Sequence, residues 1–296
     1  MNNRIIPASE FVINADGSAF HLHLKPGQIA DHIILVGDRE RVNMVASNFD
    51  ADSIECDVCN REFHTITGRY NGHRISCLSH GIGAGNIDIV MTELDALVNI
   101  DFSSRQEKQK KTQLTLVRVG TSGGLQSSCP VGSYVVAKRS IGFDGLLDYY
   151  QDSEGVFDLD FENKLCMALN WNPRLPRPYT VNADADLAKR IAGNDMILGT
   201  TISAPGFYGP QGRYLRLTPI DPDINAKIEK FSYNGEQITN YEMESAAVAG
   251  MAKMMGHRAM TVCDIIAGRV DKTMNTEYHG SMEKLVKTVL SRMWED

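Results

Sequence analysis

The alternation of short apolar runs with helix-like stretches limits the folds open to this chain more than any other feature of the sequence. The apolar runs cover residues 32–37, 74–81, 115–120, 133–138, 196–204, 237–243 and 258–268. Apolar positions spaced three and four residues apart, typical of helices, cover 85–100, 221–233, 244–256 and 278–294. This order predicts an α/β layer fold built on a mostly parallel sheet.

The chain is expected to form a single domain over residues 1–296, because no Ser/Pro/Gly-rich linker or internal repeat divides it. Its least regular part, 148–180, is expected to hold a helical excursion and then a Pro-rich connection. No apolar run approaches the ~20 residues of a membrane span, and the N-terminus lacks the order of a signal peptide, so a cytoplasmic location is expected. The net charge of −7 argues against broad nucleic-acid binding, so any anion site must be a local group of arginines.

Cysteine and histidine spacings give little support for a metal site. Cys56 and Cys59 form a CxxC, but "ECDVCNREFHTITGRY" has the pattern of a strand followed by a strand, without two further ligands. Plain thiols in a reducing compartment are therefore expected. His21 and His23 of "HLH" have no acidic or histidine partner at helical spacing, and we predict no metal there. The polar stretch 103–113 is expected to be a solvated loop.

Glycines and arginines follow two of the apolar runs, where ligands gather in α/β sheets. In "LVGDRERV", Gly37 ends a strand and Arg41 lies in the first helical turn, an arrangement suited to phosphate, although this motif alone is more consistent with Arg41 as a surface cation. In "VRVGTSGG", Arg118 lies inside a strand, where an unpaired arginine is costly. The Gly-Thr-Ser-Gly-Gly after it offers amide and hydroxyl donors but is no P-loop. "HGIGAGN" (80–86) is either a tight turn or part of a ligand site.

Two carboxylates follow the strand at 237–243. In "NYEMESAA", an extended backbone would direct Glu242 and Glu244 to one side and Met243 to the other. The pair could accept hydrogen bonds from vicinal sugar hydroxyls, or could be charges at a helix start. A two-carboxylate glycosidase is conceivable, but water as the nucleophile needs no group of arginines.

The segment "GFYGPQGRY" (206–214) has the composition of a shaped loop, since glycine and proline favour turns. Phe207 offers an apolar face, Gln211 a donor and an acceptor in one plane, and Arg213 a fork of donors. This combination suits the polar edge of a planar heterocycle. Taken alone, the segment could also be an ordinary surface loop.

Several of these motifs occur together, in one order, over residues 20–245. "FHLHL", "GDRERV", "NREF", "GIG", "RVGTSG", "GFYGPQGRY" and "NYEMES" make the chain resemble the nucleoside phosphorylase family, most closely its uridine phosphorylase branch. The resemblance implies a single-domain, three-layer α/β/α fold with a central mixed, mostly parallel sheet. It also implies a pentosyltransferase of nucleoside salvage that uses inorganic phosphate as co-substrate and needs no organic cofactor.

The resemblance also implies roles for individual residues. It assigns phosphate binding to Gly37, Arg41, Arg61, Arg118 and Thr121, ribose binding to His21, Thr121, Met243 and Glu244, and base binding to Ser122, Gly123, Phe207, Gln211, Arg213 and Glu242. Arg118, Gln211, Arg213 and Glu244 would carry the catalysis. His21 and Arg61 would reach in from a neighbouring subunit, so a homodimer, or a hexamer built from dimers, is expected.

The implied reaction is phosphorolysis, in which phosphate attacks C1′ while the bond to N1 of the pyrimidine breaks. Arginines would orient the phosphate, and Gln211 with Arg213 would stabilise negative charge on the departing base. Gln211 can accept from the N3–H of uracil, which cytosine lacks, so cytidine would be rejected. Uridine is the expected substrate, with deoxyuridine and thymidine as further candidates.

Some residues leave alternatives open. The resemblance places Asp264 where purine-cleaving relatives carry an acid that contacts the base, and Asp264 is either such an acid or a structural carboxylate. The 103–113 stretch is longer than in compact bacterial members and could alter subunit packing. Glu62 matches one ligand of a monovalent cation at the subunit interface, but Asn86 replaces an expected serine. Purine nucleoside phosphorylase, hydrolytic nucleosidase and a non-catalytic nucleoside-binding module therefore remain alternative functions.

Overall fold

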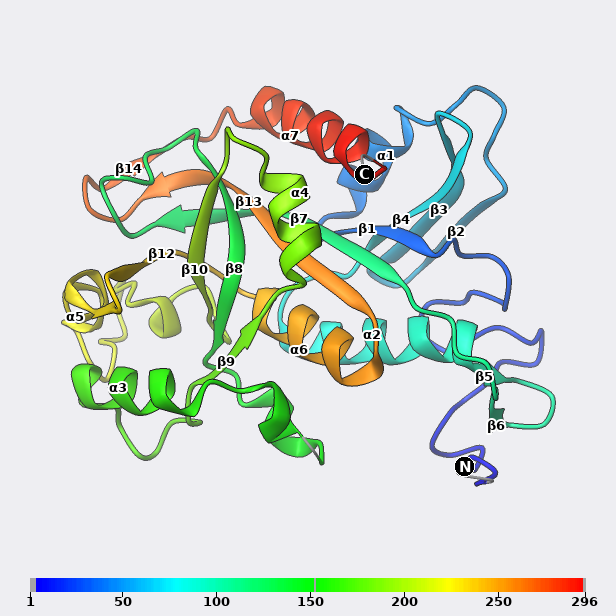
Figure 1. The fold of residues 1–296 in the computed structure, drawn as a ribbon, viewed down its shortest axis with the longest axis horizontal. Helices are drawn as coiled ribbons and strands as arrows, with labels where there is room; N and C mark the ends of the chain where they lie inside the picture. Colours follow the sequence, from blue (N-terminus) through cyan, green and yellow to red (C-terminus); the bar gives the residue numbers. More distant parts are fainter. Residues whose placement is uncertain (1–3, 152, 295–296) are drawn as a thin grey trace.

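The computed structural model describes residues 4–151 and 153–294 and contains one large sheet with helices on both faces (Figure 1). The strands of this sheet are β1 (His32–Val36), β2 (Cys56–Asn60), β3 (Phe63–Tyr70), β4 (His73–Ser79), β7 (Thr115–Gly124), β8 (Tyr134–Gly142), β9 (Tyr179–Asn182), β10 (Ile197–Ser203), β11 (Ser232–Tyr233), β12 (Glu236–Glu242), β13 (Arg258–Gly268) and β14 (Thr273–Met274). A separate short hairpin joins β5 (Ile100–Asp101) to β6 (Gln106–Glu107). The helices are α1 (Arg39–Ala46), α2 (Ala84–Asn99), α3 (Leu159–Leu169), α4 (Ala185–Ala192), α5 (Ile224–Lys230), α6 (Ser245–Met255) and α7 (His279–Arg292).

The sheet is mixed, with parallel pairs at its centre. Its order is β11-β12-β10-β8-β13-β7-β1-β4-β3-β2, and the pairs β12–β10, β10–β8, β13–β7, β7–β1 and β1–β4 are parallel. The end of β7 also pairs with the end of β12, where Gly124 lies opposite Asn240. Strands β7, β13, β8, β10 and β12 therefore close into a ring, and the carboxyl ends of β7, β12 and β13 meet.

Helices cover the two faces of the sheet and form separate apolar cores. Helices α1, α4 and α7 lie along the upper face in Figure 1, and α2 and α6 lie along the lower one. Val42, Leu187 and Leu285 belong to the upper core, whereas Leu94 and Val248 belong to the lower core. These layers confirm the three-layer α/β/α fold with a mixed central sheet.

The stretch at 103–113 is exposed or half-buried throughout, as its composition predicts, but it is not a free loop. Residues 106–107 form β6, and Arg105 binds the N-terminal segment through its Nε, which donates to the carbonyl of Ile6 at 2.7 Å. The Arg105 guanidinium also contacts the carbonyl of Phe11, and the amide of Ile6 donates to the carbonyl of Arg105 at 2.8 Å. This stretch therefore fastens the N-terminal segment to the body of the protein.

Two further differences concern local structure. The helix expected over 221–233 is shorter, because α5 ends at Lys230 and residues 232–233 form β11. The irregular region 148–180 holds α3, as expected, and ends in β9, whose pairing with β8 the sequence pattern does not predict. Within the described residues, none of the helices combines the length and apolar character needed to cross a membrane.

Candidate active site

A cavity of about 470 Å³ opens at the carboxyl ends of the central strands. Its lining brings together twelve residues that the sequence nominates as site residues: Gly37, Arg41, Arg118, Thr121, Ser122, Gly123, Phe207, Gln211, Arg213, Glu242, Met243 and Glu244. They lie within β7 and at the end of β12, or in the segments that follow β1, β10 and β12, which explains why residues far apart in sequence meet here.

Arg118 is the centre of the charged part of this cavity. It lies inside β7 and is 4% exposed, and its Nη1 lies 3.0 Å from Oε2 of Glu242 while its Nη2 contacts Glu244. Its Nε donates to Nε2 of His80 at 3.1 Å. Burial alone would lower the pKa of Arg118, but the two carboxylates raise it, so the guanidinium keeps its charge.

Glu242 is held on all sides by hydrogen bonds. Its Oε1 accepts from the hydroxyls of Ser203 at 2.5 Å and Ser245 at 2.7 Å, and its Oε2 accepts from the amides of Glu244 and Ser245 at 2.8 and 2.9 Å. A carboxylate with this many donors has a fixed position. Glu242 therefore fixes Arg118 and the start of α6, rather than offering a free oxygen to a base.

Glu244 also points toward Arg118, as the expected same-side arrangement of the two carboxylates requires. Its other oxygen, Oε1, accepts from the amide of Gly83 at 2.6 Å. This bond links α6 to the "HGIGAGN" turn at the start of α2. Met243 lines the same cavity. The strand ends at Glu242, and the backbone at Glu244 (φ −141°, ψ −19°) no longer alternates as a strand does.

Arg41 supplies a second guanidinium to the cavity. Unlike Arg118, it has no carboxylate partner within residues 4–151 and 153–294. It extends from the first turn of α1, whose N-cap is Asp38, and its Nη1 donates to the carbonyl of Val119 at 3.4 Å. Burial lowers its pKa, and the nearby charge of Arg118 lowers it further. A partly buried guanidinium beside a helix N-terminus is well suited to an anion.

The 206–214 loop contributes a separate group of residues to the same cavity, which includes the aromatic ring of Phe207. The guanidinium carbon of Arg213 lies 3.5 Å from the centre of the Phe207 ring, and the Arg213 Nη1 donates to Oε1 of Gln211. Gln211 is 3% exposed, although the loop around it lies at the surface. The segment is therefore a shaped loop that buries one polar side chain.

Arg269 joins this group, and the sequence interpretation missed it. Its Nη2 donates to the backbone carbonyl of Gln211 at 2.9 Å and lies 3.4 Å from Oε1 of the same residue. Burial, and then the neighbouring charge of Arg269, lower the pKa of Arg213 to about 10. Arg269 directly follows β13, so the rule that nominated Arg41, an arginine just after a strand, could have found it.

His21 and Arg61 lie outside the lining of this cavity. Nδ1 of His21 lies 2.7 Å from Oε1 of Glu93 on α2, an acidic partner that helical spacing does not predict. Arg61 lies at the β2–β3 turn with a left-handed backbone (φ 54°), and its guanidinium lies 5.3 Å from the centre of the Phe20 ring. The two residues are thus close neighbours on one surface, through Phe20.

Asp264 does not line the cavity, where the wall from β13 is made by Ile266 and Ala267. It is 1% exposed and accepts a hydrogen bond from the Ser281 hydroxyl on α7. Burial raises its pKa. This position supports the structural alternative for Asp264 and gives no reason to expect purine binding through it.

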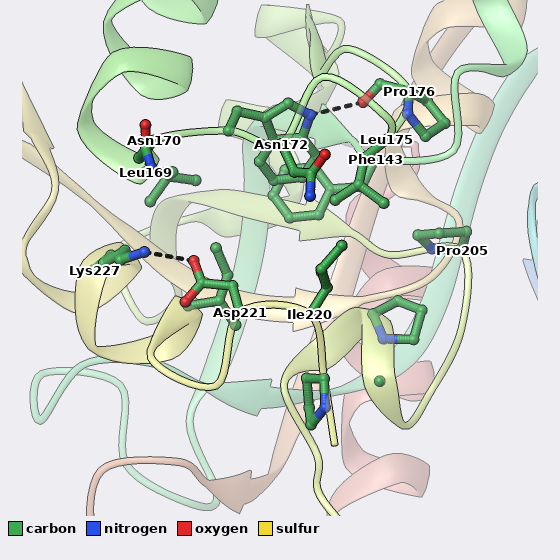
Figure 2. A pocket seen from close by; sticks show the side chains of 15 residues that line it. Phe143, Leu169, Asn170, Asn172, Leu175, Pro176, Pro205, Ile220, Asp221 and Lys227 are labelled. Carbon is green, nitrogen blue, oxygen red and sulfur yellow. Dashed lines mark hydrogen bonds and ion pairs between the residues drawn. The ribbon is translucent and has the colours of Figure 1, made fainter. Parts of the chain in front are cut away.

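Figure 2 shows a second cavity, of about 440 Å³, whose lining includes Gly209 and Pro210 of the 206–214 loop. Phe143 and Leu175 give it apolar walls, and an ion pair of 2.6 Å joins Asp221 to Lys227 at its edge (Figure 2). It contains none of the nominated residues and no cluster of charges comparable to Arg118 with its two glutamates. We therefore place the candidate active site in the first cavity.

Comparisons with known proteins agree with this choice. The family model described as "Phosphorylase superfamily" matches residues 31–293. A uridine phosphorylase of Thermococcus kodakarensis is 30% identical over 261 residues, covering 86% of this chain and 79% of the other. A DeoD-type purine nucleoside phosphorylase of Aliivibrio fischeri is 27% identical over 246 residues, covering 83% and 84%.

Solved structures give the same result. A Trypanosoma brucei nucleoside phosphorylase, described as showing uridine phosphorylase activity, superposes with a TM-score of 0.86 at 28% identity, covering 95% of this chain and 98% of the other. A uridine phosphorylase of Phytophthora capsici superposes with a TM-score of 0.68 at 21% identity, covering 96% of each chain, and supports the fold alone.

Proposed function

Because this chain belongs to the phosphorylase superfamily, we propose that it is a uridine phosphorylase, which converts uridine and phosphate reversibly to uracil and ribose 1-phosphate. One observation carries the choice of uracil. The side chain of Gln211, which lines the same cavity as Arg41 and Arg118, is buried between the guanidiniums of Arg213 and Arg269. Amide and guanidinium groups match the alternating oxygen and N–H groups on the edge of a uracil ring.

Phosphate would bind between Arg41 and Arg118, with donors from the turn at Gly37 and from Thr121. The Nη2 of Arg118 carries two N–H groups and directs one of them to Glu244, which leaves the other for a phosphate oxygen. Arg41 has no carboxylate to neutralise it within the described residues. Together they would hold the phosphate nucleophile in line with C1′, which lowers the barrier by orientation.

Ribose would lie beside Met243 and Glu244, since the Glu244 carboxylate can accept hydrogen bonds from vicinal hydroxyls. Negative charge develops on the uracil as its bond to C1′ breaks. Arg213 and Arg269 lie close enough to lower the pKa of Arg213, and an arriving negative charge relieves that repulsion. Ser122, Gly123 and Phe207 would complete the base site, with Glu242 acting through Arg118.

We further propose that the active site is shared between two copies of the chain, with His21 and Arg61 reaching the partner's ribose and phosphate. Their exclusion from the cavity of their own chain supports this arrangement. The chain would act as one domain, because one sheet runs from β1 to β14. A cytoplasmic location is proposed on the ground that all six cysteines are free thiols.

A panel of nucleosides, assayed with and without phosphate, tests the proposal. Uridine should yield uracil and ribose 1-phosphate only when phosphate is present, whereas inosine and cytidine should react at least about 100-fold more slowly. Cleavage of uridine without phosphate would indicate a hydrolase, and preference for inosine would indicate a purine phosphorylase.

A variant then links the substrate choice to the site. Gln211→Ala should lower kcat/KM for uridine about 10- to 100-fold, because it leaves two guanidiniums without their acceptor and the base without its donor. Gln113→Ala is a matched control, since Gln113 is exposed and its side chain donates to the carbonyl of Gly256 at 2.8 Å, away from the cavity. Equal losses in the two variants would contradict the assignment of Gln211 to the base.

A further inference from the structure

A side-chain cluster on the β2–β3 hairpin contains three metal-binding residue types. Asp57 and Cys59 are two residues apart on β2 and so point to the same face, and Cys59 lies directly opposite His64 on β3. One oxygen of Asp57, the Cys59 sulfur and one nitrogen of His64 all lie within 4.8 Å of one another. Cys56 is buried on the other face of the strand, so the cluster uses only one cysteine of the CxxC.

We propose that Asp57, Cys59 and His64 form a binding site for a zinc-like divalent transition-metal ion. Thiolate, imidazole and carboxylate are the ligands that zinc prefers. The His64 ring is fixed, since it is 7% exposed and its Nε2 lies 2.8 Å from Oδ1 of Asp57. The exposed carboxylate and thiol can adjust around it.

The geometry needs only a small adjustment to hold such an ion. Ligands bound at about 2.0–2.3 Å in a tetrahedron lie about 3.3–3.7 Å from one another. The Asp57–His64 pair would therefore open by roughly half an ångström, and the exposed Cys59 side chain would adjust to bring its sulfur to the bonding distance. Binding would replace the thiol proton, which passes to solvent, so affinity should rise with pH.

A fourth ligand would have room beside Cys59 and His64. Cys59 and His64 line a cavity of about 790 Å³ that also contains Glu62 and Asn86. Water could therefore complete the tetrahedron. This site differs in chemistry from a monovalent-cation site at Glu62 and Asn86, which would offer oxygen atoms only.

Zinc at this position would join the two strands whose connecting turn carries Arg61. A ligand that binds only the folded hairpin stabilises the protein, by an amount that grows with the logarithm of its concentration relative to Kd. We therefore expect zinc to raise Tm and cobalt to report the ligands directly, because cobalt bound to a thiolate absorbs in the near ultraviolet.

The test titrates cobalt chloride into the full-length protein under a non-thiol reductant and records absorbance. The wild type should gain a thiolate-to-cobalt charge-transfer band whose intensity corresponds to about one thiolate per chain. Added zinc should displace the cobalt and remove the band. Cys59→Ser should abolish the band, and His64→Gln should weaken binding at least about 10-fold. Cys166→Ser is the matched control, since Cys166 lies on α3 outside the hairpin and is also a free thiol, and it should keep the band.

Zinc should also raise the Tm of the wild type and of Cys166→Ser but leave that of Cys59→Ser unchanged. Melting curves without metal show whether each variant folds, and a variant that does not fold is replaced by Cys59→Ala or His64→Asn. Absence of the band in folded wild type, or its persistence in Cys59→Ser, would overturn the proposal. Loss of the band in Cys166→Ser would do the same.

Discussion

Arg118 donates a hydrogen bond to Glu244, so the residue proposed to bind phosphate and the residue proposed to bind ribose contact each other directly. Both side chains are buried, with 4% exposure each. A buried ion pair is costly to break, because removal of one partner leaves the other charge without compensation. The two halves of the substrate site are therefore joined through one rigid contact, and changes at Arg118 should affect both.

Arg118→Lys should lower kcat/KM for uridine by about 10²- to 10³-fold, the range seen when one donor to a reacting group is removed. Lysine keeps the charge but cannot reach His80, Glu242 and Glu244 with a planar fork. KM for phosphate and KM for uridine should both change in steady-state assays. Arg258→Lys is the control, since Arg258 pairs with Asp184 outside the cavity, and activity near wild type is expected. Unchanged activity in Arg118→Lys would contradict the proposed role of Arg118 in phosphate binding.

Gly120→Ala should also impair phosphate use, although Gly120 has no side chain that could contact the phosphate. A Cβ atom there would lie 2.7 Å from Nη1 of Arg118, so the guanidinium must move. A displacement of about 1 Å in a positioning group can cost about 100-fold in rate. Gly209→Ala should be nearly neutral, because Gly209 lies outside this cavity and a Cβ atom there would meet no other atom within 4 Å. The two variants are compared by kcat/KM for phosphate at saturating uridine.

Arg269→Ala should affect the base rather than the phosphate. Loss of a hydrogen bond from a charged donor costs about 1.5–3 kcal/mol, or about 10- to 150-fold in kcat/KM for uridine. KM for phosphate should stay within about twofold of the wild-type value, because the substitution removes no contact at the phosphate end of the site. Arg216→Ala serves as the control, since Arg216 is an exposed arginine just after the 206–214 loop. A larger effect on phosphate than on uridine would contradict the placement of Arg269.

The sequence predicts the central strands and the layered fold because continuous apolar runs and helical spacing depend on burial alone. The expected run 258–268 matches β13 residue for residue, and the fold and the family resemblance are confirmed. Sequence patterns are weaker guides where tertiary contacts decide the outcome. Arg105 lies in a polar stretch that predicts a solvated side chain, yet it binds backbone carbonyls of a segment about 100 positions away.

The candidate site shows the same division between local and tertiary information. Residues just after strands could be nominated from sequence, since parallel strands end at one edge of a sheet. The Arg118–Glu242–Glu244 network could not, because it depends on β7 closing onto β12 at Gly124 and Asn240. The functional roles of these residues stay predictions until the variants above are measured.

His80→Gln should change how stability depends on pH. His80 is fully buried, and its Nε2 accepts from Nε of Arg118, so the neutral ring is required. Burial, together with the charge of Arg118, holds the pKa of His80 well below its usual 6.5. Above pH 6.5 the ring is neutral in both states, and His80 adds no pH dependence. Below pH 6.5 the unfolded chain takes up a proton that the folded chain refuses, so stability falls.

The expected loss is about 1.4 kcal/mol in the free energy of unfolding for each pH unit below about 6.5, until the folded pKa is reached. The glutamine amide oxygen can still accept from Arg118 but does not titrate, so the variant should lose this slope. Urea unfolding at pH 7.5 and 5.5, at one protein concentration, measures the difference between wild type and variant. His279→Gln, at a mostly exposed histidine, should keep the wild-type slope. If His80→Gln also keeps that slope, His80 takes up a proton in the folded protein, and the neutral acceptor assigned to Arg118 is wrong.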